Sequence, residues 1–188
     1  LQGDDQVGVV EGKWIVFQSD SQDIVPPSST FTDIFLVDAD AVVNHVSPNR
    51  YLVSTGSTVA ANGPSGNPTL TTDRTFGNPY PPAVIYLKPN TQPCVVYQSD
   101  ASNLDSNFTD ANGRSDLYVW CNSTVPGDRT NRLLTRTTGG GGISGGAWNP
   151  SVSADGRTIA FVSDASNLVP GVGGEQVYLM DRDPDGDG

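Results

Sequence analysis

One motif occurs three times in the sequence, and it constrains the fold more than any other feature. Each copy is a short apolar run that ends in Ser-Asp and is followed by a second apolar run. The first runs are residues 15–20 (IVFQSD), 95–100 (VVYQSD) and 159–164 (IAFVSD). Self-similarity of this kind is typical of a chain built from one supersecondary unit repeated along its length. The sequence therefore predicts three copies of one unit.

Each unit is predicted to be antiparallel β-structure. The apolar runs are rich in β-branched and aromatic residues, are short, and are bounded by Gly, Pro, Asn and Asp. Several are apolar at successive positions, which favours strands covered on both faces. We expect strands at 6–10, 13–19, 33–38 and 50–55 in the first unit, at 67–72, 93–99, 116–121 and 131–137 in the second, and at 149–153, 157–163 and 176–181 in the third, whose last strand is missing.

Four strands per unit and a period of roughly 65–80 residues favour an all-β, β-propeller-like fold with three blades in an incomplete ring. Residues 1–188 then form a single propeller-like segment, with blades at about 6–55, 67–137 and 149–181 and an acidic tail at 181–188. The alternative is a β-sandwich, which predicts a cleaner alternation of apolar and polar residues.

Two strings in the third unit, residues 152–170 (VSADGRTIAFVSDASNLVP) and 177–183 (VYLMDRD), resemble TolB-like β-propeller repeats. The resemblance is weaker in the first unit, where SQDI at 21–24 replaces the ASNL form. It implies a ring of six blades and a secreted or periplasmic location. That family includes binding and scaffold modules as well as propellers attached to peptidases, so the resemblance does not assign an activity.

Three blades leave an apolar face open at each end of the row. We expect the ring to be completed by further chain or by another copy, or the copies to stack into a fibre. The chain begins at Leu1 rather than Met, which favours a processed chain or a fragment, and it ends inside an acidic motif, which favours a truncated one.

The final residues, 181–188 (DRDPDGDG), match the start of a D-x-D-x-D-G calcium loop. Alternating carboxylates converge on one hard cation in such a loop. The distal acidic ligand would lie beyond the sequence given, so a partial site is predicted, with calcium as its cofactor. The alternative is an acidic turn in solvent. The candidate metal ligands are Asp181, Asp183, Asp185 and Asp187.

The two cysteines are predicted to form a disulfide. Aligning Val96 with Val119 on antiparallel strands places Cys94 opposite Cys121, within reach of a cross-strand bridge. Such a bridge indicates an oxidising compartment, secreted or periplasmic. The alternative is two unrelated buried thiols.

The net charge is −11, which argues against duplex nucleic acid as a partner and against docking on anionic membranes. The apolar runs are also far shorter than the about 20 residues that span a bilayer, so no membrane insertion is expected. The expected partners are other proteins or copies of this chain.

No catalytic residue is predicted. Residues 142–146 (GISGG) satisfy the G-x-S-x-G pattern around Ser144, but they lie in a glycine-rich run and do not lead from strand into helix. The single histidine, His45, has no partner visible in the sequence and is interpreted as a surface residue. The repeated Ser-Asp pairs at 19/20, 99/100 and 163/164 are interpreted as side chains that close turns.

Three functions remain open. The first is a non-catalytic extracytoplasmic propeller segment that acts as a scaffold or protein-interaction module. The second is a self-assembling subunit of an extracellular filament or homo-oligomer. The third is the accessory propeller of a larger secreted hydrolase or carbohydrate-active enzyme. The insertion at 74–93 and the loop at 100–115 interrupt the repeat and are the candidate contact surfaces.

Overall fold

In the computed structural model, the residues described are 6–11, 14–26, 28–38, 49–56, 59–71, 93–123, 129–153 and 156–182. These residues form eleven β-strands, so the all-β prediction is confirmed. The strands are β1 (Gln6–Glu11), β2 (Trp14–Ser19), β3 (Asp33–Asp38), β4 (Arg50–Leu52), β5 (Ser65–Thr71), β6 (Cys94–Ser99), β7 (Asp116–Cys121), β8 (Arg132–Leu133), β9 (Ala147–Val152), β10 (Thr158–Ser163) and β11 (Gln176–Asp181).

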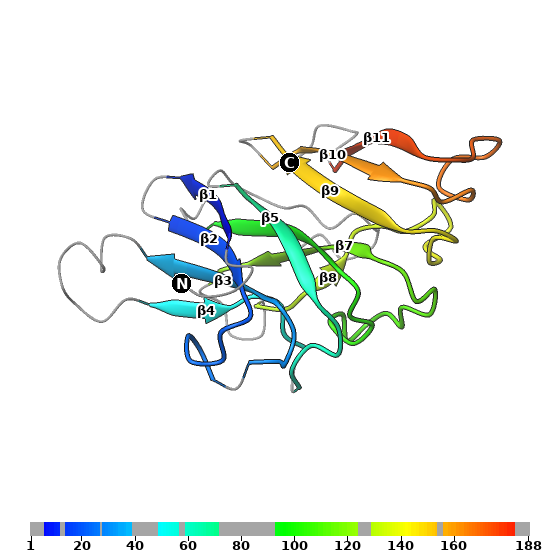
Figure 1. Ribbon diagram of the computed structural model, residues 1–188. Coiled ribbons are helices and arrows are strands. Elements are labelled where there is room, and N and C mark those ends of the chain that lie inside the picture. The colour runs from blue at the N-terminus through cyan, green and yellow to red at the C-terminus, as the bar shows by residue number, and fades with distance from the viewer. Residues whose placement is uncertain are drawn as a thin grey trace.

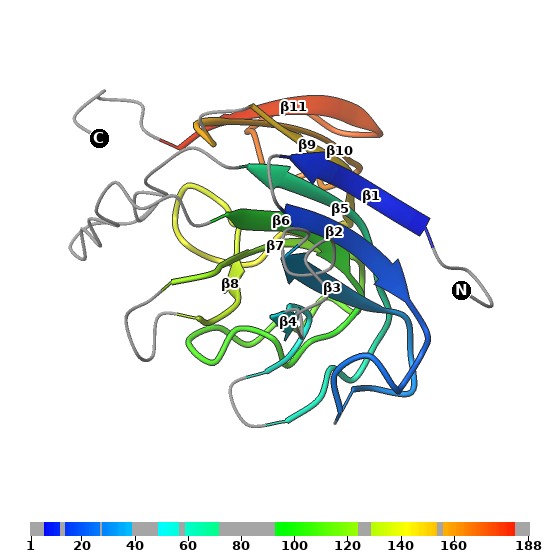
Figure 2. The same ribbon diagram turned by 90° about the vertical axis from the view of Figure 1, so that its left-hand side faces the viewer.

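The strands form three antiparallel sheets that follow the chain order (Figure 1). We call β1–β4 the first sheet, β5–β8 the middle sheet and β9–β11 the third sheet. Among the described strands no ladder joins one sheet to another. The opening strands β1, β5 and β9 lie next to one another in chain order (Figure 2).

The core lies between the sheets in two separate layers. One hydrophobic cluster joins the first and middle sheets, and a second joins the middle and third sheets. Alternate residues of β6 divide between the layers: Val95 and Tyr97 belong to the first cluster, whereas Cys94 and Val96 belong to the second. The middle sheet is therefore covered on both faces, as its unbroken apolar runs predict.

The strands that close the first two sheets are shorter than the sequence predicts. β4 ends at Leu52 because the hydroxyl of Ser54 accepts the backbone N–H of Ile34 at 2.9 Å and donates to the carboxylate of Asp33 at 2.7 Å. In the middle sheet the hydroxyl of Thr135 likewise accepts the backbone N–H of Leu117 at 3.1 Å and donates to the carboxylate of Asp116 at 2.5 Å. A side-chain hydroxyl thus replaces the next ladder bond.

The strands that open the middle and third sheets begin two residues earlier than predicted. The predicted strands open with Asn67-Pro68 and Asn149-Pro150. Each pair instead lies in a shift of register, where Asn67 has φ 48° and Asn149 has φ 53°. Asparagine tolerates this left-handed conformation, so the ladder continues on both sides of the bulge.

The repeated Ser-Asp turns are closed by their serines, as predicted. The hydroxyl oxygens of Ser19, Ser99 and Ser163 accept the backbone N–H two residues further on, at 3.0, 3.0 and 3.1 Å. All three serines are buried. Since each strand ends at this serine, the hydrogen bond turns the chain out of the sheet at the same point in every unit.

Candidate interaction surface

The third sheet has one face that no described residue covers. In β11, Tyr178 and Met180 pack on the cluster shared with the middle sheet. The alternate residues point the other way because successive side chains of a strand lie on opposite faces. They are Val177 and Leu179, which are 73% and 74% exposed. We call the face that carries them the outer face of the third sheet.

The same positions are buried in the other two sheets. The repeat aligns Val177 with Ile34 in β3 and Leu117 in β7, and aligns Leu179 with Leu36 and Val119. In those two sheets the exposed fraction of the four side chains is 0% for Ile34, Leu36 and Leu117 and 5% for Val119. Each is covered by the sheet that follows.

Neighbouring strands extend the apolar outer face. In β10, Val162 pairs with Val177 and Ala160 pairs with Leu179, and cross-strand partners share a face. On its other side Val162 pairs with Trp148 of β9, which is half-buried. β11 is an edge strand of this sheet and lies on the side of the molecule away from β4 (Figure 1).

A charged pair borders this face. Asp181, the last residue of β11, accepts hydrogen bonds from Arg157 at 3.0 and 3.1 Å. Both side chains remain more than two-fifths exposed. An exposed ion pair of this kind contributes little to stability. It forms a polar border beside the apolar side chains of the outer face.

Repeated amide hydrogen bonds link one sheet to the next. The Oε1 atom of Gln18 in β2 accepts the backbone N–H of Asn67 at 3.0 Å, and Gln98 in β6 accepts that of Asn149 at 2.9 Å. The side chain of Asn67 also donates to Gln98 and Asn149, at 2.9 and 3.0 Å. In the third sheet Val162 occupies the position of the two glutamines. Its outer face therefore lacks this acceptor.

Sequence reasoning missed these amide links, although they left a signal. Glutamine precedes Ser-Asp in the first two units, and Asn-Pro opens the second and third. The two residue types thus occur in each pair of adjacent units, one on each side of the contact.

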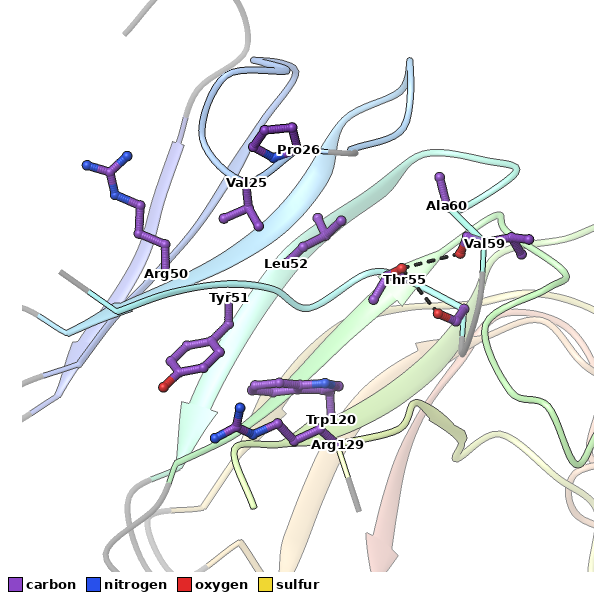
Figure 3. A pocket seen from close by; sticks show the side chains of 11 residues that line it. Val25, Pro26, Arg50, Tyr51, Leu52, Thr55, Val59, Ala60, Trp120 and Arg129 are labelled. Carbon is purple, nitrogen blue, oxygen red and sulfur yellow. Dashed lines mark hydrogen bonds between the residues drawn. The ribbon is translucent and has the colours of Figure 1, made fainter. Parts of the chain in front are cut away.

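A cavity of about 490 Å³ lies beside β4 (Figure 3). Tyr51 lies between Trp14 and Trp120, with ring centroids 6.3 and 5.9 Å apart, and the guanidinium of Arg129 lies 4.9 Å above its ring. The Nε of Arg129 donates to the backbone carbonyl of Ser123 at 2.8 Å. These side chains are engaged in holding the first and middle sheets together, and the cavity is wide open to solvent.

The predicted disulfide is confirmed. Cys94 and Cys121 pair directly in the ladder between β6 and β7, two residues from the Val96–Val119 pair, and their sulfur atoms are bonded. Cys94 is buried, and both cysteines contact the cluster between the middle and third sheets. A buried disulfide points, weakly, to an oxidising compartment outside the cytoplasm.

The predicted calcium loop is described only at its first residue, Asp181, which is engaged with Arg157. Asp183, Asp185 and Asp187 lie outside the described residues. Within the described ranges, no three His, Cys, Asp or Glu side chains are grouped as metal ligands. Calcium binding stays a prediction.

Two sequence features were considered for catalysis, Ser144 and His45, and the structure describes only the first. Ser144 is exposed in a loop before β9, and its hydroxyl shares a hydrogen bond with that of Ser166 at 3.1 Å. His45 lies outside the described residues. Residues 142–146 lie in the loop before β9 and do not lead from a strand into a helix. This agrees with the context that the sequence predicts for them.

Of the two candidate contact segments, residues 74–92 lie outside the described residues. The loop at 100–115 is held against its own sheet. Asp105 accepts the backbone N–H of Leu133 at 2.9 Å and pairs with Arg136 at 2.8 Å. Asn112 donates to the carboxylate of Asp116 at 2.9 Å and to two carbonyl oxygens of the loop before β9. These hydrogen bonds fix the loop on the middle sheet, while Ser106, Asn107, Thr109 and Arg114 remain exposed, so its role as a contact surface stays a prediction.

Burial raises the pKa of two carboxyl groups at this loop, Asp110 within it and Asp116 directly after it. Burial raises the pKa of Asp116 to about 6, and the charge of Asp110 adds to the increase, although hydrogen bonds from Thr135 and Asn112 oppose it. Burial also raises the pKa of Asp110. Asp116 accepts a hydrogen bond from the hydroxyl of Thr135, just after β8. The protonation of Asp116 and Asp110 therefore links the stability of the middle sheet to pH.

The chain matches no protein-family model and no curated protein sequence. In the part of the chain that the structure describes, no helix is long and apolar enough to cross a membrane.

Proposed function

We propose that this chain is a non-catalytic segment of a β-propeller-like protein that works outside the cytoplasm as a scaffold or protein-interaction module. The observation that carries the proposal is the outer face of the third sheet. Val177 and Leu179 are about three-quarters exposed there, although their equivalents in both other sheets are buried. The equivalent faces of the first and middle sheets are covered by a neighbouring sheet. We therefore infer that this exposed apolar face also binds a partner.

The middle sheet supports the comparison with propeller blades. It is a four-stranded antiparallel sheet whose two faces are both used, each against a neighbouring sheet of the same repeat. Blades of a propeller pack in this way, with their opening strands adjacent. The neighbouring positions of β1, β5 and β9 are consistent with that arrangement.

The chemistry of the described polar residues supports a structural role. The buried serines close turns, and the buried carboxylates of Asp33, Asp105 and Asp116 accept hydrogen bonds from backbone or hydroxyl groups. Buried polar groups that satisfy backbone and hydroxyl partners in this way stabilise the fold. The Cys94–Cys121 disulfide supports an extracytoplasmic location.

The experiment compares two cysteines at equivalent positions of the repeat. Leu179→Cys and Val119→Cys are made separately, and each folded variant is treated with a thiol reagent; the native cysteines are bonded to each other and do not react. We expect Leu179→Cys to react at least about a hundredfold faster, because Val119→Cys reacts only after local opening. Equal, slow rates would show that the outer face is covered, and the proposal would fail.

A further inference from the structure

We infer that Asn107 is a site of N-linked glycosylation, where an oligosaccharide is attached to the side-chain amide. The inference rests on the proposed function in one respect, because this modification belongs to proteins that leave the cytoplasm. Two observations carry it. One is a sequence motif that occurs twice, and the other is the opposite burial of its two copies in the structure.

The acceptor motif is Asn-x-Ser/Thr, in which x is any residue except proline. Residues 107–109 (NFT) and 122–124 (NST) match it, whereas 67–69 (NPT) and 149–151 (NPS) contain the excluded proline. The motif consists of the asparagine and the hydroxyl residue two positions later, so a transferase has to reach both side chains. The structure separates the two candidates on this requirement.

At the first motif, both required side chains lie on the surface. Asn107 and Thr109 are exposed in the loop between β6 and β7. Within the part of the chain that the structure describes, neither the side-chain amide of Asn107 nor the hydroxyl of Thr109 makes a hydrogen bond. An oligosaccharide on Asn107 therefore breaks no contact of the described fold.

The neighbouring residues hold the backbone of this motif in place. The backbone N–H of Asn107 donates to Oδ1 of Asp105 at 2.8 Å, which closes an Asx turn. Phe108 is half-buried and packs on the cluster between the first and middle sheets, and the guanidinium of Arg136 lies 4.3 Å from its ring centre. Asn107 and Thr109 are thus exposed on either side of an anchored phenylalanine.

The second motif is part of the packed structure. Asn122 directly follows β7 and is only 2% exposed, and its backbone N–H donates to the carbonyl of Pro93 at 3.0 Å. Ser123 is buried as well, and its carbonyl accepts the Nε of Arg129 at 2.8 Å. A bulky, hydrophilic oligosaccharide does not fit at a buried side chain. A chain modified at Asn122 would therefore not reach this fold.

The transfer uses an oligosaccharide carried on a lipid pyrophosphate and a membrane-bound transferase. The Nδ2 atom of Asn107 forms a bond to C1 of the first sugar while the bond between C1 and the pyrophosphate oxygen breaks. The lipid pyrophosphate leaves with the electron pair of that bond, and one amide proton passes to a base of the transferase. The step requires no oxidant or reductant.

An oligosaccharide at Asn107 also limits where a protein partner binds. It would shield the exposed residues of the loop at 100–115, because an attached glycan is bulky and hydrated. The outer face of the third sheet carries neither motif. The modification therefore deepens the proposed function, since it leaves the outer face, and not this loop, as the surface for protein partners.

The test is secretion of the full 188-residue chain from eukaryotic cells behind a cleavable signal segment, followed by peptide mass mapping. Treatment with peptide-N-glycosidase in heavy-oxygen water converts each glycosylated asparagine to a labelled aspartate, and a sample without the enzyme accounts for spontaneous deamidation. We expect the label at Asn107 and none at Asn122. An intact Cys94–Cys121 disulfide in the same map shows that the chain is folded. A chain retained in the cell is mapped from the secretory membranes.

Matched variants locate the site by a second route. Asn107→Gln and Thr109→Ala each destroy the first motif and should abolish the added mass completely. Thr109→Ser keeps the hydroxyl and should keep the oligosaccharide. The control is Thr124→Ala, which destroys the second motif and leaves Asn122 in place, and it should retain the full added mass.

A disulfide-bonded chain with an unmodified Asn107 would overturn the inference, and so would a label at Asn122. Thiol labelling of Leu179→Cys separates such a failure from that of the proposed function. Rapid labelling of a chain without the oligosaccharide would remove the modification site and leave the outer face as an interaction surface. Slow labelling of a chain that is glycosylated at Asn107 would remove the proposed function and leave the modification site.

Discussion

Two leucines at the same position of the repeat should differ widely in their contribution to stability. Leu36 of β3 is fully buried, whereas Leu179 of β11 is 74% exposed. We predict the effect on the free energy of unfolding of changing each one to alanine in a dilute solution of the chain. Both occupy the fourth position of a six-residue strand.

The expected magnitudes follow from burial. Leu36→Ala removes a buried side chain and leaves a cavity, a change that costs about 3–5 kcal/mol in free energy of unfolding. Leu179 has only a quarter of its surface removed from water, and full burial of leucine is worth about 2–3 kcal/mol, so Leu179→Ala should cost about 0.5 kcal/mol. The two variants should therefore differ by at least about 2 kcal/mol.

The assay is urea unfolding followed by tryptophan fluorescence, with the slope of the transition checked to be equal in all three proteins. For a chain of 188 residues, these losses of stability correspond to a drop in Tm of about 6–20 °C for Leu36→Ala and about 1–2 °C for Leu179→Ala. If Leu179→Ala costs more than about 2 kcal/mol in the monomer, the outer face is packed within the chain and the reasoning is wrong.

Three further perturbations test other parts of the molecule. Changing Cys94 and Cys121 to alanine should lower the free energy of unfolding by about 3.5 kcal/mol, from the entropy of a loop that spans 27 residues. Asp116→Asn should flatten the pH dependence of stability. With the pKa of Asp116 at about 6 in the folded state, the native chain binds more protons than the unfolded chain between about pH 4 and 6, so stability falls as pH rises through that window. Asn131→Asp should cost about 2–4 kcal/mol, because the buried amide donates to the carbonyl oxygens of Val53 and Thr55, just after β4, at 2.7 and 2.8 Å.

Each of these has its own control. A reductant should destabilise the unchanged chain but leave the alanine double variant unaffected, and an equal response in both would contradict the disulfide argument. For Asp116→Asn, urea midpoints are measured from pH 4 to 7 at constant ionic strength; an unchanged slope would mean that another group titrates. For Asn131→Asp, a loss that is the same at pH 3 and pH 7 would show that a negative charge beside the carbonyl oxygens is not the cause.

Local features of the fold could be predicted from the sequence, whereas contacts between sheets could not. The alignment of Val96 with Val119 placed the disulfide correctly, because two adjacent antiparallel strands fix every pair once one pair is known. The end of β4 was missed, because the ladder stops where the hydroxyl of Ser54 takes the N–H of Ile34, a bond between residues 20 apart.

The contacts between sheets depend on how whole sheets are placed. Gln18 and Asn67 are 49 residues apart, and nothing local in either strand indicates that they meet. The exposure of Val177 is equally invisible in its own strand, since the run at 176–181 has the same apolar pattern as buried β3 and β7. β3 and β7 differ from β11 only because another sheet of the described chain packs on that face of each.

The disulfide has a mechanical consequence because it lies in the middle sheet, which contacts both others. A force that pulls the two ends of the chain apart is transmitted through β6 and β7, where a covalent bond bypasses the loop between Cys94 and Cys121. Each residue of an extended chain contributes at most about 3.6 Å, so the 27 residue steps of that loop would withhold roughly 90 Å of extension until the bond is reduced. In an oxidising environment the chain would thus lengthen less under tension than its residue count implies.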